Sequence, residues 1–158
     1  MDQARAGALN SLELLLCRVQ QRICGIPLPR VIETLRPLPL EPLSGAPDFV
    51  LGLSIIRGAP VPVVDAGLLL GGVAVRPTRF VTLRAGPRTV ALAVDSVIGV
   101  QLLDSASTGD LPPLLAGVAN AAIEALGTLD RALLWVLESS RLVPERVSGE
   151  LDGAGRSA

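Results

Sequence analysis

Residues 52–65 read GLSIIRGAPVPVVD, and this stretch is the most informative part of the sequence about the fold. Apolar residues fill both halves of the stretch, and Gly58 lies between them, where a hairpin can reverse. We expect strands at 50–57 and 61–65, with Gly58 in the positive φ region that glycine adopts easily. The stretch therefore predicts a β-hairpin, and the surrounding sequence has the same pattern of short apolar runs and turn residues.

Short apolar runs separated by turn residues continue on both sides of this hairpin. Upstream, residues 12–19 and 23–28 predict a hairpin around the polar turn Gln20-Gln21-Arg22. Downstream, three further runs predict strands at 80–83, 89–94 and 97–103, the first two joined by Gly86-Pro87. About nine or ten short strands are expected in all, which indicates a mainly β fold.

The remaining segments are assigned to loops, helical turns and the last strands. Residues 36–47 are rich in proline and predict an ordered surface loop, and 104–113 predict a second loop. Residues 117–126 and 132–137 are expected to be strands, although 115–126 also fits helical spacing. Three short segments are expected to form helical turns: 31–35, 66–70 and 138–143.

The composition excludes several classes of protein. Hydrophobic residues make up 49% of the 158 residues and charged residues 18%, so the chain can bury a sizeable core. Its 14 basic residues are all arginine and face 15 acidic residues, and the net charge of −1 does not support nucleic-acid binding. Histidine, lysine and tyrosine are missing, which removes the common catalytic and metal-binding groups. We expect no catalytic residues, no metal site and no cofactor.

The two cysteines and the hydropathy pattern indicate the compartment. Cys17 and Cys24 are not spaced as a CxxC pair, and no second pair exists to complete a zinc site. A tight turn could bring them together, but we expect small buried side chains in a reducing cytosol. No charge-free apolar run approaches the roughly 18–20 residues of a membrane span. The expectation is a soluble cytoplasmic protein with flexible tails at 1–10 and 145–158.

Four segments, taken in sequence order, carry a family pattern. Residues 26–33 contain an apolar stretch followed by Val-Ile-Glu, and 52–65 contain a strand ending in Arg-Gly, then an apolar strand with proline that ends in Asp. Residues 88–97 end in Val-Asp-Ser-Val, and 129–137 read LDRALLWVL. Together they resemble the CheW family of bacterial chemotaxis coupling proteins, over about residues 12–144.

The chain departs from this family pattern at several positions. The family usually has Asn where Ile55 stands, Gly where Ala91 and Ala125 stand, and Asp where Glu138 stands. Glu124 is a lone charge in an apolar segment, facing either solvent or a partner. These differences indicate a divergent member.

The resemblance implies a fold and a function. The implied fold is two small five-stranded SH3-like β-barrels packed on a shared hydrophobic core, spanning residues 11–144. The implied function is a non-enzymatic adaptor that binds the regulatory domain of a CheA-type histidine kinase with one barrel. A groove between the barrels would bind the cytoplasmic coiled-coil tip of a chemoreceptor (a methyl-accepting chemotaxis protein). Such an adaptor lies in the cytoplasm at receptor arrays by the inner membrane, without membrane insertion.

The resemblance also implies a partner-binding surface around Glu33 and Arg57. We expect these two side chains to form an ion pair there, because a planar guanidinium suits a carboxylate. The alternative is an ordinary surface pair with no role in binding. Four neighbouring residues complete the expected partner-binding set: Val31, Ile32, Ile55 and Gly58.

Four further residues are expected to be structural. Gly52 opens its strand, and Asp65 and Asp95 each end a strand, where aspartate caps or turns the chain. The neighbours of Trp135 are all apolar, so Trp135 is expected in the core.

Three other functions stay open. A related coupling protein could serve surface motility or pilus control with other partners, and a degenerate member could bind only one partner. The alternative from a different class is a small β-barrel enzyme or ligand-binding protein, and the missing histidine, lysine and tyrosine argue against it.

Overall fold

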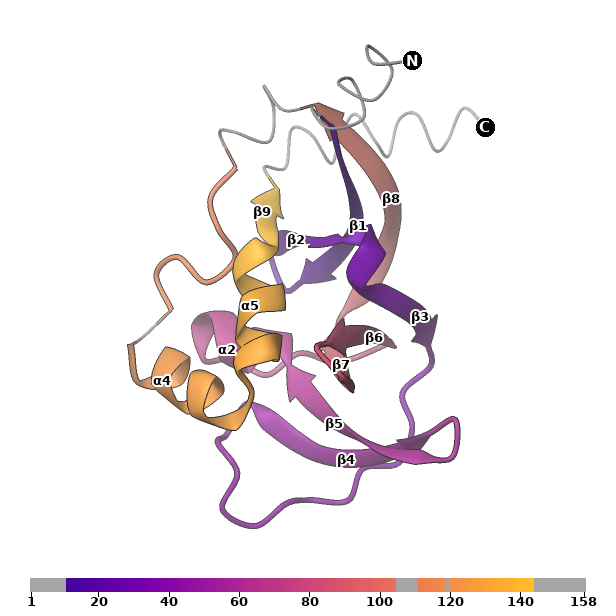
Figure 1. The fold of residues 1–158 in the computed structure, drawn as a ribbon, viewed down its shortest axis with the longest axis vertical. Coiled ribbons are helices and arrows are strands. Elements are labelled where there is room, and N and C mark those ends of the chain that lie inside the picture. The colour runs from indigo at the N-terminus through magenta and orange to yellow at the C-terminus, as the bar shows by residue number, and fades with distance from the viewer. Residues whose placement is uncertain (1–10, 105–110, 119, 144–158) are drawn as a thin grey trace.

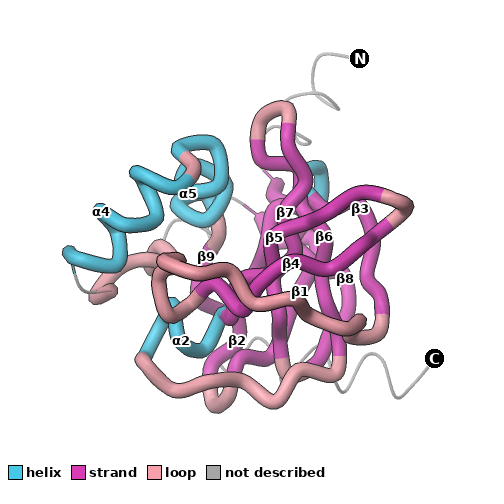
Figure 2. Tube along the Cα trace, turned by 90° about the horizontal axis from the view of Figure 1, so that it is seen from below, coloured by secondary structure: helices cyan, strands magenta, loops and turns pink. Residues whose placement is uncertain are grey.

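The computed structural model describes residues 11–104, 111–118 and 120–143, and its strands form two sheets with three α-helices on one side (Figures 1 and 2). The tails expected at 1–10 and 145–158 lie outside the described residues, as does part of the loop expected at 104–113. The elements in chain order are β1 (Ser11–Val19), β2 (Arg22–Pro27), η1 (Leu28–Arg30), β3 (Val31–Leu35), β4 (Val50–Ile56), β5 (Ala59–Asp65), α2 (Ala66–Gly71), β6 (Arg79–Ala85), β7 (Arg88–Val94), β8 (Ser96–Asp104), α4 (Asn120–Leu129), α5 (Arg131–Ser139) and β9 (Arg141–Val143).

The first sheet has the strand order β8-β1-β2-β9, and all its neighbours are antiparallel. The predicted β1–β2 hairpin is confirmed, and its register places Cys17 directly opposite Cys24. Both cysteines are free and buried, as expected. β9 pairs with the outer edge of β2 and thereby covers backbone groups that would otherwise be open.

The second sheet has the strand order β3-β6-β7-β5-β4. The predicted hairpins β4–β5 and β6–β7 are both present, and β5 and β7 run parallel between them. The expected mainly β fold is confirmed. In place of five strands in each of two barrels, the described residues give sheets of four and five strands whose end strands do not pair with each other.

The loop at 36–47 covers the outer edge of β4. The backbone N–H of Glu41 donates to the carbonyl of Leu53 at 2.8 Å, and the N–H of Leu53 donates back to Glu41 at 2.8 Å. Gly52 makes this approach possible, because a Cβ at this position would lie 2.3 Å from the carbonyl oxygen of Glu41. Its φ of +143° is also one that residues with side chains rarely adopt.

The main hydrophobic core lies between the two sheets. It combines residues of both sheets with α2 and α5, including Leu15, Val63, Leu69, Phe80 and Leu137. A smaller cluster lies on the opposite face of the first sheet and is formed by Leu14, Leu16, Ile23, Leu103, Leu111 and Val143. The two sheets therefore share one core.

Two of the three expected helical turns are wrong, and one is confirmed. Residues 66–70 lie in the short helix α2, as expected. Residues 31–35 form strand β3, because the prolines at 27 and 29 place the helical turn one step earlier, in η1. Residues 138–143 contain the end of α5 and then strand β9.

The strands expected at 117–126 and 132–137 are also wrong, because these residues belong largely to α4 and α5. The side chain of Asp130 starts α5 by accepting hydrogen bonds from the N–H groups of Ala132 and Leu133. Helical spacing then buries Leu133 and Leu137 and leaves Trp135 53% exposed, so the core position expected for Trp135 is wrong too. No helix in the described part of the chain is long and apolar enough to cross a membrane.

Candidate functional site

The predicted ion pair between Glu33 and Arg57 is present. The guanidinium binds the carboxylate through two contacts, Nη2 to Oε2 at 2.8 Å and Nε to Oε1 at 3.2 Å. The Arg57 side chain is 81% exposed and that of Glu33 27% exposed. The guanidinium is therefore oriented by its partner and still accessible to another molecule.

The pair joins opposite edges of the five-stranded sheet. Glu33 lies on β3 at one end of the strand order, and Arg57 lies in the turn between β4 and β5 at the other end. Both segments come together on one side of the molecule (Figure 1). The sheet must curve strongly for the two side chains to meet, so the ion pair bridges the opening that the curved sheet leaves.

The turn that carries Arg57 has an unusual backbone. Gly58 has a φ of 80°, as predicted, and Arg57 itself has a φ of 54°. Two successive residues with positive φ are typical of the two-residue turns that match the twist of a hairpin. A non-glycine residue is uncommon in this region, so the conformation of Arg57 is imposed by the hairpin.

A groove of about 580 Å³ lies beside the ion pair. Its walls include Ile32, Glu33, Arg57, Pro60, Thr82 and Arg88. Ile32 is 42% exposed, so a large apolar side chain lies next to the charged pair. An apolar wall with a charged rim is typical of protein–protein interfaces.

The structure divides the expected partner-binding set. Ile32, Glu33 and Arg57 meet at the groove, while Val31 is partly buried against the core. Ile55 is 65% exposed, but it lies on the adjoining outer face of β4, in a hollow that it shares with Leu40 and Pro60. Because Pro60 lines both the hollow and the groove, the two surfaces are contiguous.

The pair is charged over the ordinary pH range. The hydrogen bonds from the Arg57 guanidinium, together with its charge, lower the pKa of Glu33 below the ordinary value of 4.5. The same hydrogen bonds and the charge of Glu33 raise the pKa of Arg57.

Asp65 is the last residue of β5 and Asp95 directly follows β7, and both accept hydrogen bonds from main-chain N–H groups. The buried carboxylate of Asp65 caps α2 by accepting a hydrogen bond from the N–H of Leu68 at 2.9 Å. It also accepts one from the N–H of Val75, in the loop after α2, at 3.2 Å. Asp95 accepts from the backbone N–H groups of Gln20 and Arg76. These bonds fix loops, and the described residues contain no group of three or more potential metal ligands of the His, Cys, Asp or Glu type.

The two free cysteines, which lie opposite each other on β1 and β2, are buried in the core. Burial raises the pKa of Cys17 and that of Cys24 to about 12. Since the thiolate is the reactive form, both side chains are unreactive in the folded protein at neutral pH.

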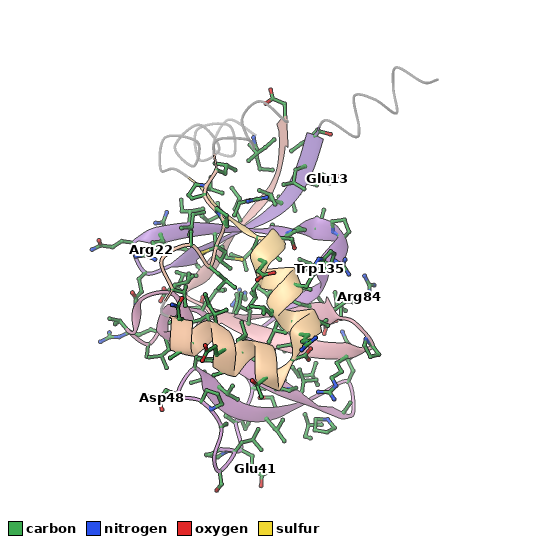
Figure 3. The ribbon with its side chains drawn as sticks, turned by 60° about the vertical axis from the view of Figure 1, so that its left-hand side comes forward. Glu13, Arg22, Glu41, Asp48, Arg84 and Trp135 are labelled. Carbon is green, nitrogen blue, oxygen red and sulfur yellow. The ribbon has the colours of Figure 1, made fainter. Side chains whose placement is uncertain are left out.

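A second, larger groove is lined by Trp135, a residue that the sequence predicted to lie in the core. It has a volume of about 1090 Å³ and lies between the two C-terminal helices and the β6–β7 turn, with Trp135 and the exposed Glu124 among its walls. The guanidinium carbon of Arg30 lies 4.1 Å from the centroid of the Trp135 ring, and Figure 3 shows the position of Trp135 on α5. An aspartate just before an apolar run is the signal that would have predicted the start of a helix here, and helical spacing then buries Leu133 and Leu137 and leaves Trp135 outside.

Both sheets and the ion pair lie in a region that is similar to known proteins. The family model of the CheW-like domain matches residues 13–147. The chain is similar to the chemotaxis protein CheW of Klebsiella aerogenes, with 24% identity over 155 residues that cover 96% of this chain and 93% of that protein. It is 33% identical to Protein FrzA of Myxococcus xanthus over 124 residues, which cover 76% of each.

A solved structure supports the fold. The scaffolding protein TtCheW from Thermoanaerobacter tengcongensis aligns with a TM-score of 0.57 and 20% identity, over 61% of this chain and 68% of that chain. The region matched by the family model includes the 52–65 hairpin, Glu33 and Arg57. With its hairpin, its ion pair and nearly all of its described strands inside that region, the chain belongs to the CheW-like domain family.

Proposed function

We propose that this chain is a non-enzymatic adaptor that couples chemoreceptors to a CheA-type histidine kinase in bacterial chemotaxis. The observation that carries the proposal is the accessible Glu33–Arg57 pair on the rim of an apolar groove. The family to which the chain belongs includes chemotaxis proteins and a scaffolding protein, which supports the same function. Such an adaptor acts in the cytoplasm, at receptor arrays by the inner membrane.

The adaptor works by holding two partners at once. The regulatory domain of the kinase and the coiled-coil tip of the receptor dock on surfaces that include the groove and the adjoining face around Ile55. Because the ion pair connects β3 with the β4–β5 turn, a partner that moves one sheet edge changes the contact offered at the other. Coupling then follows from unequal affinity of the two partners for the two arrangements.

Charge reversal tests the proposal. Arg57→Glu and Glu33→Arg are each made alone and together, and affinity is measured calorimetrically for a receptor tip fragment and a kinase regulatory domain separately. We expect each single reversal to weaken at least one partner about tenfold or more, as truncation of an interface hot spot does. The double reversal restores the ion pair and is expected to recover part of the affinity.

Arg22→Glu is the matched control, since Arg22 is an exposed arginine beside the other hairpin turn (Figure 3). It should leave both affinities unchanged. If the reversals at 33 and 57 also leave both affinities unchanged, the pair is an ordinary surface ion pair and the proposed role is wrong.

The similarity to Protein FrzA favours a second candidate, a coupling protein of a different pathway, such as surface motility or pilus control. The biochemistry would be the same and the partners different. Capture experiments with the receptors and kinases of the source organism distinguish the two, because each candidate names a different kinase and receptor as the bound pair.

A further inference from the structure

Strand β3 contains a β-bulge next to the ion pair. Val31 lies opposite Leu83 of β6, and Glu33 lies opposite Thr82, so Ile32 is an extra residue with no counterpart. A bulge of this kind re-aims the side chains that follow it.

The bulge decides which face of the sheet Glu33 occupies. In a regular register Ile32 would lie opposite Thr82, and Glu33 would lie opposite Val81, on the other face. With the extra residue, Glu33 shares the face of Thr82, which lines the groove together with Arg57. The ion pair therefore depends on a register shift of one residue.

The hydroxyl of Thr82 holds the backbone at this point. It accepts a hydrogen bond from the N–H of Glu33 at 3.1 Å and donates one to the carbonyl oxygen of Glu33 at 3.2 Å. Thr82 is only 1% exposed, so water has little access to replace these bonds. One side chain thus satisfies both backbone groups of the residue that carries the carboxylate.

We propose that Thr82 is a positioning residue for the partner-binding surface: its hydroxyl stabilises the bulge at Ile32 and so turns Glu33 toward Arg57. The effect on partner affinity rests on the proposed function. The effect on Glu33 does not, because it can be measured in the free protein.

The test compares Thr82→Val, which has nearly the same shape without the hydroxyl, with Thr82→Ser, which keeps the hydroxyl. The readout is an NMR titration of the Glu33 carboxyl carbon in the full chain without partners. We expect the pKa of Glu33 to rise toward its ordinary value in Thr82→Val and to stay lowered in Thr82→Ser. A Glu33 pKa that stays lowered in folded Thr82→Val would overturn the proposal.

Two additions separate positioning from general loss of structure. Backbone resonances of the β1–β2 hairpin should be unchanged, and Thr82→Ala provides a second variant without the hydroxyl if Thr82→Val does not fold. In an Arg57→Gln background, Thr82→Val should no longer alter the pKa of Glu33, because the partner that lowers it is gone. An equal change in both backgrounds would overturn the proposal, because the hydroxyl would then act on Glu33 independently of Arg57.

Partner affinity is measured last, with the receptor tip fragment and the kinase regulatory domain. We expect Thr82→Val to weaken binding by up to about tenfold, and to add little to the effect of Glu33→Gln. Unchanged affinity in a variant whose Glu33 pKa has moved would overturn the binding role. If the unmodified chain binds neither probe, the proposed function fails, while the titration still decides the role of Thr82 in the free protein.

Discussion

The hairpins β1–β2 and β4–β5 end in two-residue turns that share one backbone feature, a first residue at positive φ, and use it differently. Each turn begins with a non-glycine residue at positive φ, Gln20 at 57° in the first and Arg57 at 54° in the second. In the described residues these are the only non-glycine residues with positive φ. Both turns therefore place a non-glycine residue in an uncommon conformation at their first position, but only the β4–β5 turn continues with a second positive φ, at Gly58.

The side chains at these two positions make different contacts. The amide of Gln20 donates to the carbonyl oxygens of Val73 and Ala74, and its backbone N–H donates to Asp95, so the first turn is fixed to the body of the protein. Arg57 contacts Glu33 and is otherwise open to solvent. Gln20 therefore stabilises the fold, whereas Arg57 stays accessible, as its proposed role in partner binding requires.

The largest expected effect is on the stability of the fold and concerns the strands of the β4–β5 hairpin. Unlike the exposed turn, these strands are closely packed at Gly52. Gly52→Ala should destabilise the fold by about 3 kcal/mol or more, because the new Cβ meets the carbonyl of Glu41 at a φ that alanine avoids. Gly71→Ala is the control, since a Cβ there meets nothing within 4 Å. Urea unfolding measures both, and an equal effect at the two positions would contradict the role given to Gly52.

The next effect concerns the anchor of the first turn. Asp95→Ala removes the acceptor for the N–H groups of Gln20 and Arg76, and we expect a loss of about 2–3 kcal/mol. Asp48→Ala removes an exposed carboxylate and should change stability by less than about 0.5 kcal/mol. Similar unfolding midpoints for the two variants would mean that the first turn is no more anchored than an ordinary surface loop.

Exchanging the first residue of each turn for asparagine compares the turns directly, because asparagine tolerates positive φ. Gln20→Asn shortens the anchoring side chain and should cost about 1 kcal/mol of stability without altering partner affinity. Arg57→Asn should leave the unfolding midpoint close to that of the unmodified chain and weaken partner binding about tenfold. The comparison fails if the two variants have the reverse pattern.

The smallest expected effect is the pH dependence of the exposed pair. The pKa of Glu33 is lower in the folded protein than its ordinary value, so the pair adds stability above that value and loses it as the pH falls through the folded pKa. The difference in stability between the unmodified chain and Arg57→Gln should therefore be present at neutral pH and vanish in acid. High salt should reduce it, since the pair is exposed. A difference that grows toward acid would contradict the assignment.

Much of the β structure could be predicted because turn residues mark its boundaries. Gly58 and the Gly86-Pro87 turn locate the β4–β5 and β6–β7 hairpins without tertiary information. The C-terminal part lacked such marks. The apolar residues 133–137 fit a strand and a buried helix equally well, and only the cap formed by Asp130 distinguishes them. The five residues of β3 were too few to show alternation after two prolines.

The site was predictable to the extent that it depends on a family pattern. The ion pair between Glu33 and Arg57 follows from the resemblance, although 24 residues separate its members. The role of Thr82 does not, because it depends on the register between strands 49 residues apart and on a bulge that no local sequence feature marks. The exposure of Trp135 could not be predicted either, because it depends on helical spacing in a segment that was expected to be a strand.

The ring of Trp135 under the guanidinium of Arg30 has a practical consequence. The chain contains one tryptophan and no tyrosine, so its ultraviolet fluorescence comes almost entirely from this ring. Any binding event that moves Arg30 away, or dries the groove beside α5, will change the emission of the whole molecule. The protein thus carries an intrinsic optical reporter at the junction of η1 and α5, and its spectrum can be followed without attaching a label.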